Sequence, residues 1–193
     1  MKIVNSRTTK FPIDDNFLER YSPRAMSGKS ISNDELTTLF EAARWAPSSQ
    51  NLQPWRFIYA KRYTENFKLF LSFLMEGNRI WCEKASALVI TISKKTNNKG
   101  DLSITHSFDT GSAWENLALQ ATSMGLVTHG MGGIYYDLIK EKMNIPDDYS
   151  VEMMIAIGKP GIIEDLPEPL RARETPSDRK PLEEIIFEGK FKN

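Results

Sequence analysis

The stretch RWAPSSQNLQPWRF, residues 44–57, holds more polar and rigid side chains than a connection between two elements requires. It contains two tryptophans, two prolines, two serines and three amides. Serine and asparagine often bond backbone groups at helix ends and in turns, which explains some of these residues without any ligand. A simple turn leaves the others unexplained, so the stretch is a candidate binding segment.

Regular elements are predicted on both sides of this stretch. Ser32 followed by Glu35 is a capping-box pattern, and apolar residues then recur at helical spacing, which predicts a helix over 32–45. Pro47 opposes continuation of that helix, because proline lacks a backbone N–H and clashes with the preceding turn. The aromatic and β-branched run at 55–60 predicts a strand. The candidate segment therefore joins a helix to a strand.

The rest of the chain mixes strands and helices without a regular βαβ order, which predicts an α+β fold. The run ALVITIS at 87–93 is apolar almost throughout, so we expect a central strand covered on both faces. The strongest helical pattern lies at 108–124, where apolar residues cover much of the helix surface. Further helices are expected over 64–76, ended by Gly77, and over 135–143, with strands over 126–133 and 151–158.

The composition indicates one globular domain over residues 1–193, long enough to bury a substantial core. The 25 basic residues equal the 25 acidic ones, so the charge balance does not favour nucleic acid as a partner. Cys82 is the only cysteine, which excludes an intrachain disulfide and fits a reducing compartment. No apolar run approaches the ~20 residues of a membrane helix, and the N-terminus lacks a signal-peptide core. We therefore expect a cytoplasmic protein without a membrane partner.

After Gly158 the sequence becomes rich in proline, with five prolines between residues 160 and 181. Proline at this density favours an extended arm over a compact element. The arm, about 160–193, includes LEEIIFEG at 182–189, whose apolar centre is typical of a strand. An arm with an apolar end would dock on its own domain or on a partner subunit.

Two short basic segments are candidates for contact with a phosphate. In RYSPR, residues 20–24, an extended backbone would direct Arg20, Ser22 and Arg24 to one side. Guanidinium groups bind phosphate oxygens through paired hydrogen bonds, so this triplet suits a phosphate. DRK at 178–180 is a second basic segment, on the proline-rich arm. Taken alone, each segment is more commonly a solvated, exposed turn.

GMGG at 130–133 follows a predicted strand and invites comparison with the dinucleotide-binding fingerprint. The comparison fails, because GxGxxG starting at Gly130 requires glycine at position 135, where Tyr135 stands. Glycines before a helix still allow backbone N–H groups to approach a ligand closely. A plain tight turn explains the segment equally well.

The sequence contains no pattern typical of a metal site or of a catalytic nucleophile. His106 and His129, the only histidines, are far apart and lack neighbouring ligands at metal-binding spacing. His129 is better explained as a hydrogen-bonded structural residue. Ser48 and Ser49 have no evident base, so neither is interpreted as a nucleophile. We therefore assign no metal and no catalytic side chain.

Five segments, in this order along the chain, resemble the FMN-dependent nitroreductase family over nearly its whole length. RYSPR resembles the family's N-terminal Arg-x-Ser-x-basic signature. APSSQNLQPWRF is the most specific segment, very similar to the motif Ala-Pro-Ser-Ser-x-Asn-x-Gln-Pro-Trp-x-Phe. GLVTHGMGG, VEMMIAIGKP and RKPLEEIIFEG resemble the glycine turn, the Gly-x-Pro strand end and the C-terminal motif.

The resemblance implies a homodimer with a central, mostly antiparallel sheet flanked by helices and a C-terminal arm exchanged between subunits. Two FMN sites would lie at the interface, each lined by both subunits. Arg20, Ser22 and Arg24 would hold the FMN phosphate and ribityl chain, with Arg179 from the arm. Asn51 and Gln53 would form hydrogen bonds with the flavin ring or the ribityl hydroxyls. Pro47, Ser48 and Ser49 would reach the flavin held mainly by the other subunit. Gly132 and Gly133 would lie along the isoalloxazine edge.

The implied activity is that of an NAD(P)H-dependent FMN oxidoreductase, which reduces a small acceptor by ping-pong hydride transfer. The acceptor would be a nitroaromatic, a quinone, an enone or a flavin. Two alternatives remain open. One is a non-catalytic protein that stores or senses FMN, and the other is a specialised family member, such as a dehalogenase or a flavin-destroying enzyme.

Two departures from better-known members concern substrate preference more than FMN binding. Many members carry glutamate in the glycine turn, where this chain has Gly132. The region between the second predicted helix and the strand at 87–93 is short, which reduces the space for a substrate-covering insertion. Trp45, Phe70 and Phe108 are candidate pocket residues, with core packing at least as good an explanation for each.

Overall fold

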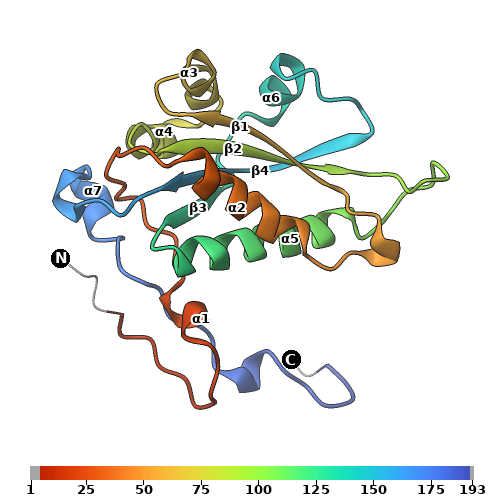
Figure 1. The fold of residues 1–193 in the computed structure, drawn as a ribbon. Helices are drawn as coiled ribbons and strands as arrows, with labels where there is room; N and C mark the ends of the chain where they lie inside the picture. The colour runs from red at the N-terminus through yellow and green to blue at the C-terminus, as the bar shows by residue number, and fades with distance from the viewer. Residues whose placement is uncertain (1–4, 192–193) are drawn as a thin grey trace.

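The computed structural model describes residues 5–191 and contains an antiparallel four-stranded sheet in the order β1-β2-β4-β3 (Figure 1). The strands are β1 (Trp55–Lys61), β2 (Ala87–Lys94), β3 (Val127–Met131) and β4 (Tyr149–Gly158). The predicted α+β class is confirmed, and the four strands predicted between residues 55 and 158 are present with small shifts at their ends.

β2 lies inside the sheet, and its side chains alternate between two hydrophobic cores. Leu88 and Ile90 face one core, whereas Ala87 and Val89 face the other. The strand pairs with β1 on one side and with β4 on the other. A strand covered on both faces needs apolar side chains at successive positions, which explains the run ALVITIS and confirms its predicted place.

Helices cover both faces of the sheet (Figure 1). α2 (Asn33–Arg44) and α5 (His106–Ser123) pack together on one face, where Leu39 and Leu117 are fully buried. α3 (Glu65–Ser72), α4 (Glu76–Cys82) and α6 (Tyr136–Lys142) lie on the other face. None of the helices within residues 5–191 is long and apolar enough to cross a membrane.

The ends of α2 and α5 follow the signals in the sequence. The capping box is present, because Glu35 N–H donates to Ser32 Oγ at 3.0 Å and Ser32 N–H donates to the Glu35 carboxylate at 2.6 Å. Gly125 follows α5 with φ of 67°, the left-handed conformation that favours glycine. Both helices therefore lie close to their predicted limits.

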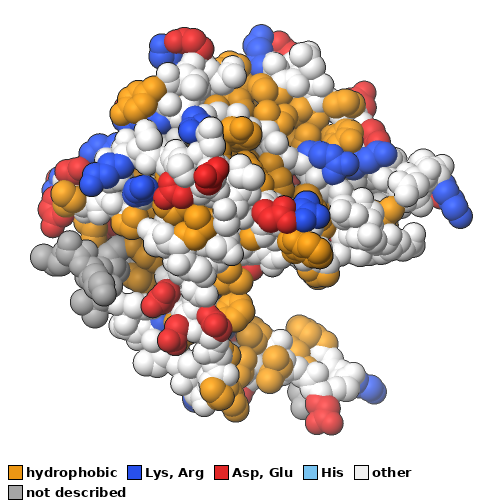
Figure 2. Space-filling model, in the orientation of Figure 1, with side chains coloured by type: hydrophobic (Ala, Val, Ile, Leu, Met, Phe, Trp, Pro, Cys, Tyr) orange, Lys and Arg blue, Asp and Glu red, His pale blue; other side chains and the backbone are white. Residues whose placement is uncertain are grey.

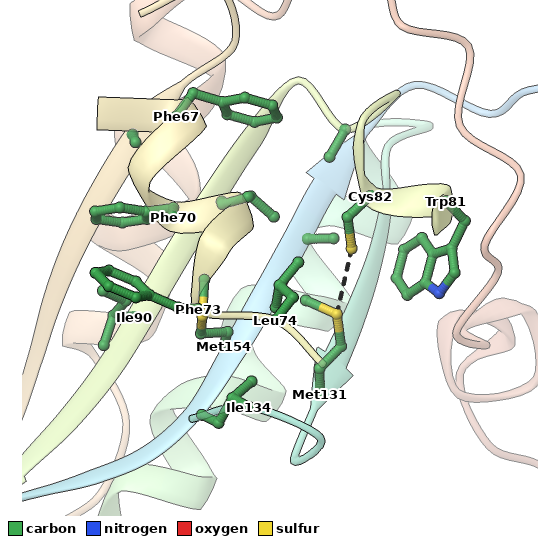
Figure 3. Close-up of a cluster of buried hydrophobic side chains, with 14 of the residues drawn as sticks. Phe67, Phe70, Phe73, Leu74, Trp81, Cys82, Ile90, Met131, Ile134 and Met154 are labelled. Atoms are coloured by element: carbon green, nitrogen blue, oxygen red, sulfur yellow. Dashed lines mark hydrogen bonds between the residues drawn. The ribbon is translucent and has the colours of Figure 1, made fainter. Parts of the chain in front are cut away.

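The core under α3, α4 and α6 combines aliphatic side chains with aromatic and sulfur-containing ones (Figure 3). Phe70 is 1% exposed there, with its ring centroid 5.8 Å from that of Phe73, so core packing is the correct explanation for this residue. The buried Cys82 thiol donates to Met131 Sδ at 3.4 Å. Burial raises the pKa of the Cys82 thiol well above its usual range, so the thiol stays protonated and unreactive.

The single helix expected over 64–76 is wrong, because the chain forms two helices in this region. α3 ends at Ser72, and Gly77, expected to end the helix, lies inside α4. Between them the backbone is drawn toward the glycine turn, where Met75 N–H donates to Gly133 O at 3.1 Å. Such a long-range bond leaves no trace in a local apolar pattern.

Segments near the two ends of the chain run together away from the main body (Figure 1). The short helix α1 (Asp15–Glu19) belongs to one segment, and the 3-10 turn η3 (Leu182–Glu184) belongs to the other. The helix α7 (Glu168–Arg171), which precedes η3, stays on the main body, where Leu170 is buried in the core. The two segments are joined where Arg7 Nε donates to Ser177 O at 2.8 Å. The extended arm is therefore present, but the strand character expected at 182–189 is wrong, since only η3 forms there.

These projecting segments expose a large apolar surface. Figure 2 shows hydrophobic side chains along them, facing the hollow below the main body. Monomeric proteins rarely expose contiguous apolar surface of this extent. The side chains concerned are at least 41% exposed and belong to Phe11, Phe17, Leu182, Ile185, Ile186 and Phe191.

Candidate functional site

Residues 20–25, called the strap below, run extended across the molecule after α1, and their side chains alternate between two cavities. Arg20 and Ser22 line one cavity, whereas Tyr21 lines the other. This alternation agrees with the extended geometry expected for RYSPR. The third predicted side chain, Arg24, lies in neither of these cavities.

Arg24 points instead toward the C-terminal arm. Its guanidinium lies 3.7 Å from Glu174 Oε2 and 3.5 Å from Arg173 O. Glu174 is almost completely buried, and its Oε1 accepts the backbone N–H groups of Arg24 and Ala25, both at 2.6 Å. This carboxylate holds the strap from the arm and occupies Arg24, which leaves Arg20 as the cation facing the cavity.

His129 holds the strap from the side of the sheet. Its Nδ1 lies 3.2 Å from Pro23 O, and because a carbonyl only accepts, Nδ1 carries the proton. The imidazole also packs against Trp81, with ring centroids 4.7 Å apart and ring planes tilted by 48°. Burial lowers the pKa of His129 to about 4, and the charge of Arg24 contributes in the same direction. His129 is thus neutral and hydrogen-bonded, the structural role expected from the sequence.

Arg7, which the sequence did not single out, brings Arg20 and Arg179 together. Arg7 Nη1 donates to the carbonyl oxygen of Arg20 at 2.6 Å, and Arg7 Nε and Arg179 Nη1 both donate to Ser177 O. Burial lowers the pKa of Arg7, and the neighbouring charges of Arg179 and Arg20 lower it further. Three guanidiniums therefore gather where the arm meets the strap. Such an excess of positive charge suits a phosphate.

The cavity beside Arg20 has a volume of about 340 Å³. One wall is α5, from which Glu115 approaches Arg20 Nε to 3.6 Å. Another wall is formed at Gly130, where a Cβ would lie 3.1 Å from Met153 Sδ and 3.3 Å from the Trp114 ring, so that these side chains would have to shift. The absence of a side chain at this position keeps the cavity open.

The glycine turn presents a free backbone donor at the same cavity. Gly132 lines the cavity, and its carbonyl accepts from Ile134 N–H at 3.0 Å. Gly133 O accepts from Met75 N–H at 3.1 Å. Neither glycine donates its own N–H to another residue within the described range. The N–H group of Gly132 is therefore available to a ligand in this cavity, whereas the predicted Gly133 does not line it.

The loop at 47–53 lies apart from the strap, beside the N-terminal end of α5 (Figure 1). Ser49 N–H donates to Asp109 Oδ2 at 3.0 Å, and Gln53 N–H donates to Ser48 Oγ at 3.1 Å. No residue of this loop lines the cavity beside the strap. Within one protomer, the two most specific motifs are therefore not brought together.

Three residues of this loop adopt the left-handed backbone conformation. The φ angles are 52° at Gln50, 54° at Asn51 and 48° at Gln53. Residues with a Cβ pay about 1–2 kcal/mol for this conformation, and asparagine tolerates it best. The side chains of Asn51 and Gln53 are nevertheless exposed to solvent. Strain of this kind is common where a segment serves a ligand.

Two aromatic candidates near the loop are exposed rather than packed in the core. Trp45 is 71% exposed and Phe108 is 78% exposed. The Arg44 guanidinium lies over the Trp45 ring, 4.8 Å from its centroid. Core packing, the alternative explanation for both aromatics, is therefore wrong for them.

The second cavity, on the opposite side of the strap, is larger but less suited to an anionic ligand. Its volume is about 560 Å³, and its charged lining residues are Glu19 and Glu164. Tyr21 also lines it, and burial together with the charge of Glu174 raises the pKa of this phenol to about 12. The smaller cavity, with Arg20 and the glycine turn, is the better candidate site.

The nitroreductase family model matches residues 18–79 and 77–159 of this chain. A crystal structure described as an oxidoreductase containing FMN has a TM-score of 0.94 and 46% identity, over 100% of this chain and 99% of that chain. A nitroreductase family protein of Clostridium difficile has the same fold, with a TM-score of 0.72 and 22% identity over 94% and 100% of the two chains. An Archaeoglobus fulgidus protein named "Putative NADH dehydrogenase/NAD(P)H nitroreductase" is 27% identical over 73% of this chain and 81% of its own. The chain therefore belongs to the nitroreductase family, as its motifs predict.

Proposed function

We propose that this protein is an FMN-dependent oxidoreductase that uses NAD(P)H to reduce a small acceptor, such as a nitroaromatic, a quinone, an enone or a flavin. The observation that carries the proposal is the cavity that joins Arg20 and Ser22 to the free N–H group of Gly132. The FMN in the 46% identical structure supports the cofactor. The name of the archaeal relative supports NAD(P)H as the reductant.

The residues present fit FMN in charge, size and hydrogen bonding. Arg7, Arg20 and Arg179 concentrate the positive charge that a phosphate monoester requires. The cavity of about 340 Å³ has the size of a small-molecule site, and Gly130 leaves open the space that a side chain would fill. The Gly132 N–H supplies a donor at the same place.

Bound FMN would supply the redox chemistry, taking a hydride from NAD(P)H and giving it to the acceptor. Arg20 and Ser22 would bind the phosphate and the ribityl chain, with Arg179 from the arm. The N–H groups of Gly132 and Gly133 would stabilise negative charge on the ring. Arg24 would act indirectly, by fixing the strap against Glu174.

A homodimer is part of the proposal, because one protomer leaves the amide side chains of its loop and the apolar side chains of its arm exposed. Pro47, Ser48, Ser49, Asn51 and Gln53 would contact the flavin held mainly by the partner's strap. Exchange of the C-terminal arm would cover the apolar side chains that the arm exposes. An interface of this kind would also bury the aromatic rings beside the loop.

The first test is the FMN content of the purified protein and its ability to oxidise NAD(P)H. We expect stoichiometric FMN after gel filtration, and NAD(P)H oxidation once a quinone or a nitroaromatic is added. Anaerobic stopped-flow reduction by NADH and NADPH separates the alternatives. Flavin that binds but is never reduced would indicate storage or sensing, and a colourless protein that takes up no added FMN would exclude the proposal.

A further inference from the structure

A polar cluster adjoins the candidate cavity, formed by the end of β2, the beginning of β4 and the first turn of α5. Glu152 Oε1 accepts hydrogen bonds from Ser93 Oγ and from Ser107 Oγ, the latter at 2.7 Å. His106 Nδ1 lies 2.7 Å from Ser93 Oγ and 3.3 Å from Ser107 Oγ. Two hydroxyl groups therefore connect one imidazole with one carboxylate.

The direction of these hydrogen bonds follows from the number of protons available. An ionised carboxylate only accepts, so the single hydroxyl proton of Ser93 goes to Glu152. Ser93 Oγ must then accept from His106, which places a proton on Nδ1 of the imidazole. The cluster is thus an ordered chain of donors from His106 through Ser93 to Glu152. The Ser107 hydroxyl donates to the same carboxylate oxygen.

The middle of this hydrogen-bond chain is buried, whereas the side chains at its two ends are partly exposed. Ser93 is 0% exposed, whereas the side chains of His106 and Glu152 are 17% and 21% exposed. Glu152 lines the cavity that contains Arg20 and Gly132. A proton can therefore pass from solvent at His106 to the cavity without water entering at Ser93.

We propose that this chain delivers a proton to the acceptor, with Glu152 as the immediate proton donor and Ser93 and His106 as positioning residues that recharge it. The proposal rests on the function proposed above. Reduction of a quinone to a hydroquinone consumes one hydride and one proton. FMN and NAD(P)H account for the hydride, but the proton needs a separate source.

The proton balance closes over one cycle. Glu152, loaded as the carboxylic acid, gives its proton to a carbonyl oxygen of the quinone and becomes a carboxylate. The Ser93 hydroxyl proton moves to Glu152 while the Nδ1 proton of His106 moves to Ser93. As Nδ1 loses its proton, Nε2 takes one from water, so the imidazole stays neutral and becomes the Nε2–H tautomer. Transfer of the proton from Nε2 to Nδ1 through solvent and rotation of the Ser93 hydroxyl then restore the starting arrangement, so that over the cycle one proton enters from solvent and one leaves on the product.

The charges around Glu152 favour this role over a purely structural one. Arg20 lines the same cavity, but the carboxylate that approaches its guanidinium, at 3.6 Å, is that of Glu115. His106 is the charged group that approaches Glu152, at 3.6 Å, and it acquires its charge only when it takes up a proton. The charge next to Glu152 therefore depends on whether His106, a member of the proposed proton path, carries an extra proton.

The hydrogen-bond chain can be tested without any cofactor. The protein has only two histidines, so nitrogen NMR of the imidazole rings resolves His106 against His129 as an internal reference. We expect the Nδ1–H tautomer at His106, and we expect Ser93→Ala to shift it toward Nε2–H while His129 stays unchanged. A His106 ring that is Nε2–H in the unmodified protein would overturn the proposed path.

The delivery step is tested on the FMN-loaded protein by measuring the two half-reactions separately. Glu152→Gln keeps the size of the side chain but cannot donate an acidic proton. We expect it to slow oxidation of the reduced protein by a quinone about 100-fold, the usual contribution of a general acid, and to abolish the solvent deuterium isotope effect on that step. Reduction by NAD(P)H should remain within a few-fold of the original rate. Ser93→Ala should slow the quinone step less, and adding Ser107→Ala should bring it near the rate of Glu152→Gln.

Thr91→Val is the matched control, because Thr91 is a second buried β2 hydroxyl, one without a hydrogen-bond partner in the described part of the chain. It should retain both half-reactions and the isotope effect. A Glu152→Gln protein that keeps the original quinone rate and isotope effect would overturn proton delivery while leaving the oxidoreductase proposal standing. Failure of the unmodified protein to be reduced by NAD(P)H would instead overturn both.

Discussion

The strap at 20–25 and the loop at 47–53 are both polar segments without regular structure, yet they are supported very differently. The strap is held by Glu174 from the arm, by His129 from the sheet and by Arg7 from the N-terminal segment. The loop has exposed amides and three residues in the left-handed conformation. One segment is fixed within its own chain, and the other is strained and largely unpartnered.

Helix α5 separates the two segments. The loop bonds Asp109 near the start of the helix, whereas Trp114 and Glu115 line the candidate cavity further along it, and the helix from Asp109 to Glu115 spans roughly 9 Å. This separation supports the proposed homodimer, in which the strap of one chain and the loop of its partner would complete one cofactor site.

The largest effect is expected from subunit complementation, which tests whether the strap and the loop of one FMN site come from different chains. Arg20→Ala removes the cation of the strap, and Asn51→Ala with Gln53→Ala removes the amides of the loop. If each site combines one strap with the partner's loop, a mixed dimer contains one site with both segments intact. We expect one FMN per mixed dimer, isolated through two different affinity tags and measured by flavin absorbance.

The parent dimers are the controls, because each has the same defect in both sites. They should retain little FMN after gel filtration. If both segments of a site came from the same chain, the mixed dimer would contain no intact site and would remain colourless.

The two arginines of the strap should differ in their effect on FMN binding. Arg20 faces the cavity, so Arg20→Ala should weaken FMN binding by about 10–100-fold, the effect of losing a charged hydrogen bond of 1.5–3 kcal/mol. Arg24 faces Glu174, so Arg24→Ala should affect FMN less and unfolding by urea more, because a buried carboxylate loses its nearest cation. Flavin fluorescence titration and urea midpoints measure the two effects. Equal loss of FMN affinity would contradict the placement of Arg24.

Lowering the pH should reduce the stability that His129 contributes by holding the strap. Its pKa is about 4 in the folded protein and 6.5 in the unfolded chain, so only the unfolded chain takes up a proton as the pH falls through 6. Stability from the neutral imidazole is therefore complete above pH 6.5 and declines toward pH 4. Between pH 7 and pH 5 the loss should be about 2 kcal/mol in the free energy of unfolding, measured with urea.

His129→Gln is the control for this titration, since glutamine can donate to Pro23 O without taking up a proton. The variant should be less stable than the original protein at pH 7 but should lose less stability on acidification. Carboxylates titrate in both proteins, so the difference between their slopes isolates His129. Parallel slopes would show that the imidazole is solvated.

The sequence predicted the elements that depend on local patterns. The capping box of Ser32, the doubly buried run at 87–93 and the glycine after α5 each carry their cause in a few adjacent residues. The division between α3 and α4 was missed because it depends on the bond from Met75 to Gly133, which are remote in sequence. Local periodicity contains no information about such a contact.

The candidate site follows the same rule: residues in short local motifs were predicted, and residues brought together only by the fold were not. Arg20, Ser22 and Gly132 belong to short motifs and line one cavity. Arg7 was not found because it lies in no motif. Glu152 lies in VEMMIAIGKP, but that segment was noted for its strand end, and only the fold brings the Glu152 side chain to the cavity. Arg24 differs from its expected direction for a related reason: its partner, Glu174, lies on an arm whose path the sequence did not determine.

The backbone strain of the loop gives the smallest expected effect and the most direct test of why the loop is strained. Gln50 has φ of 52° and is not among the residues proposed to bind flavin. Glycine adopts this conformation without penalty, so Gln50→Gly should be more stable than Gln50→Ala by about 1 kcal/mol, measured by urea unfolding of the FMN-free protein. If FMN and the partner subunit hold the loop in this conformation, glycine should also loosen FMN slightly, because a freer loop loses more entropy on binding. A Gln50→Ala protein as stable as Gln50→Gly would mean that the left-handed turn is relaxed, and the contrast between a fixed strap and a strained loop would then rest on exposure alone.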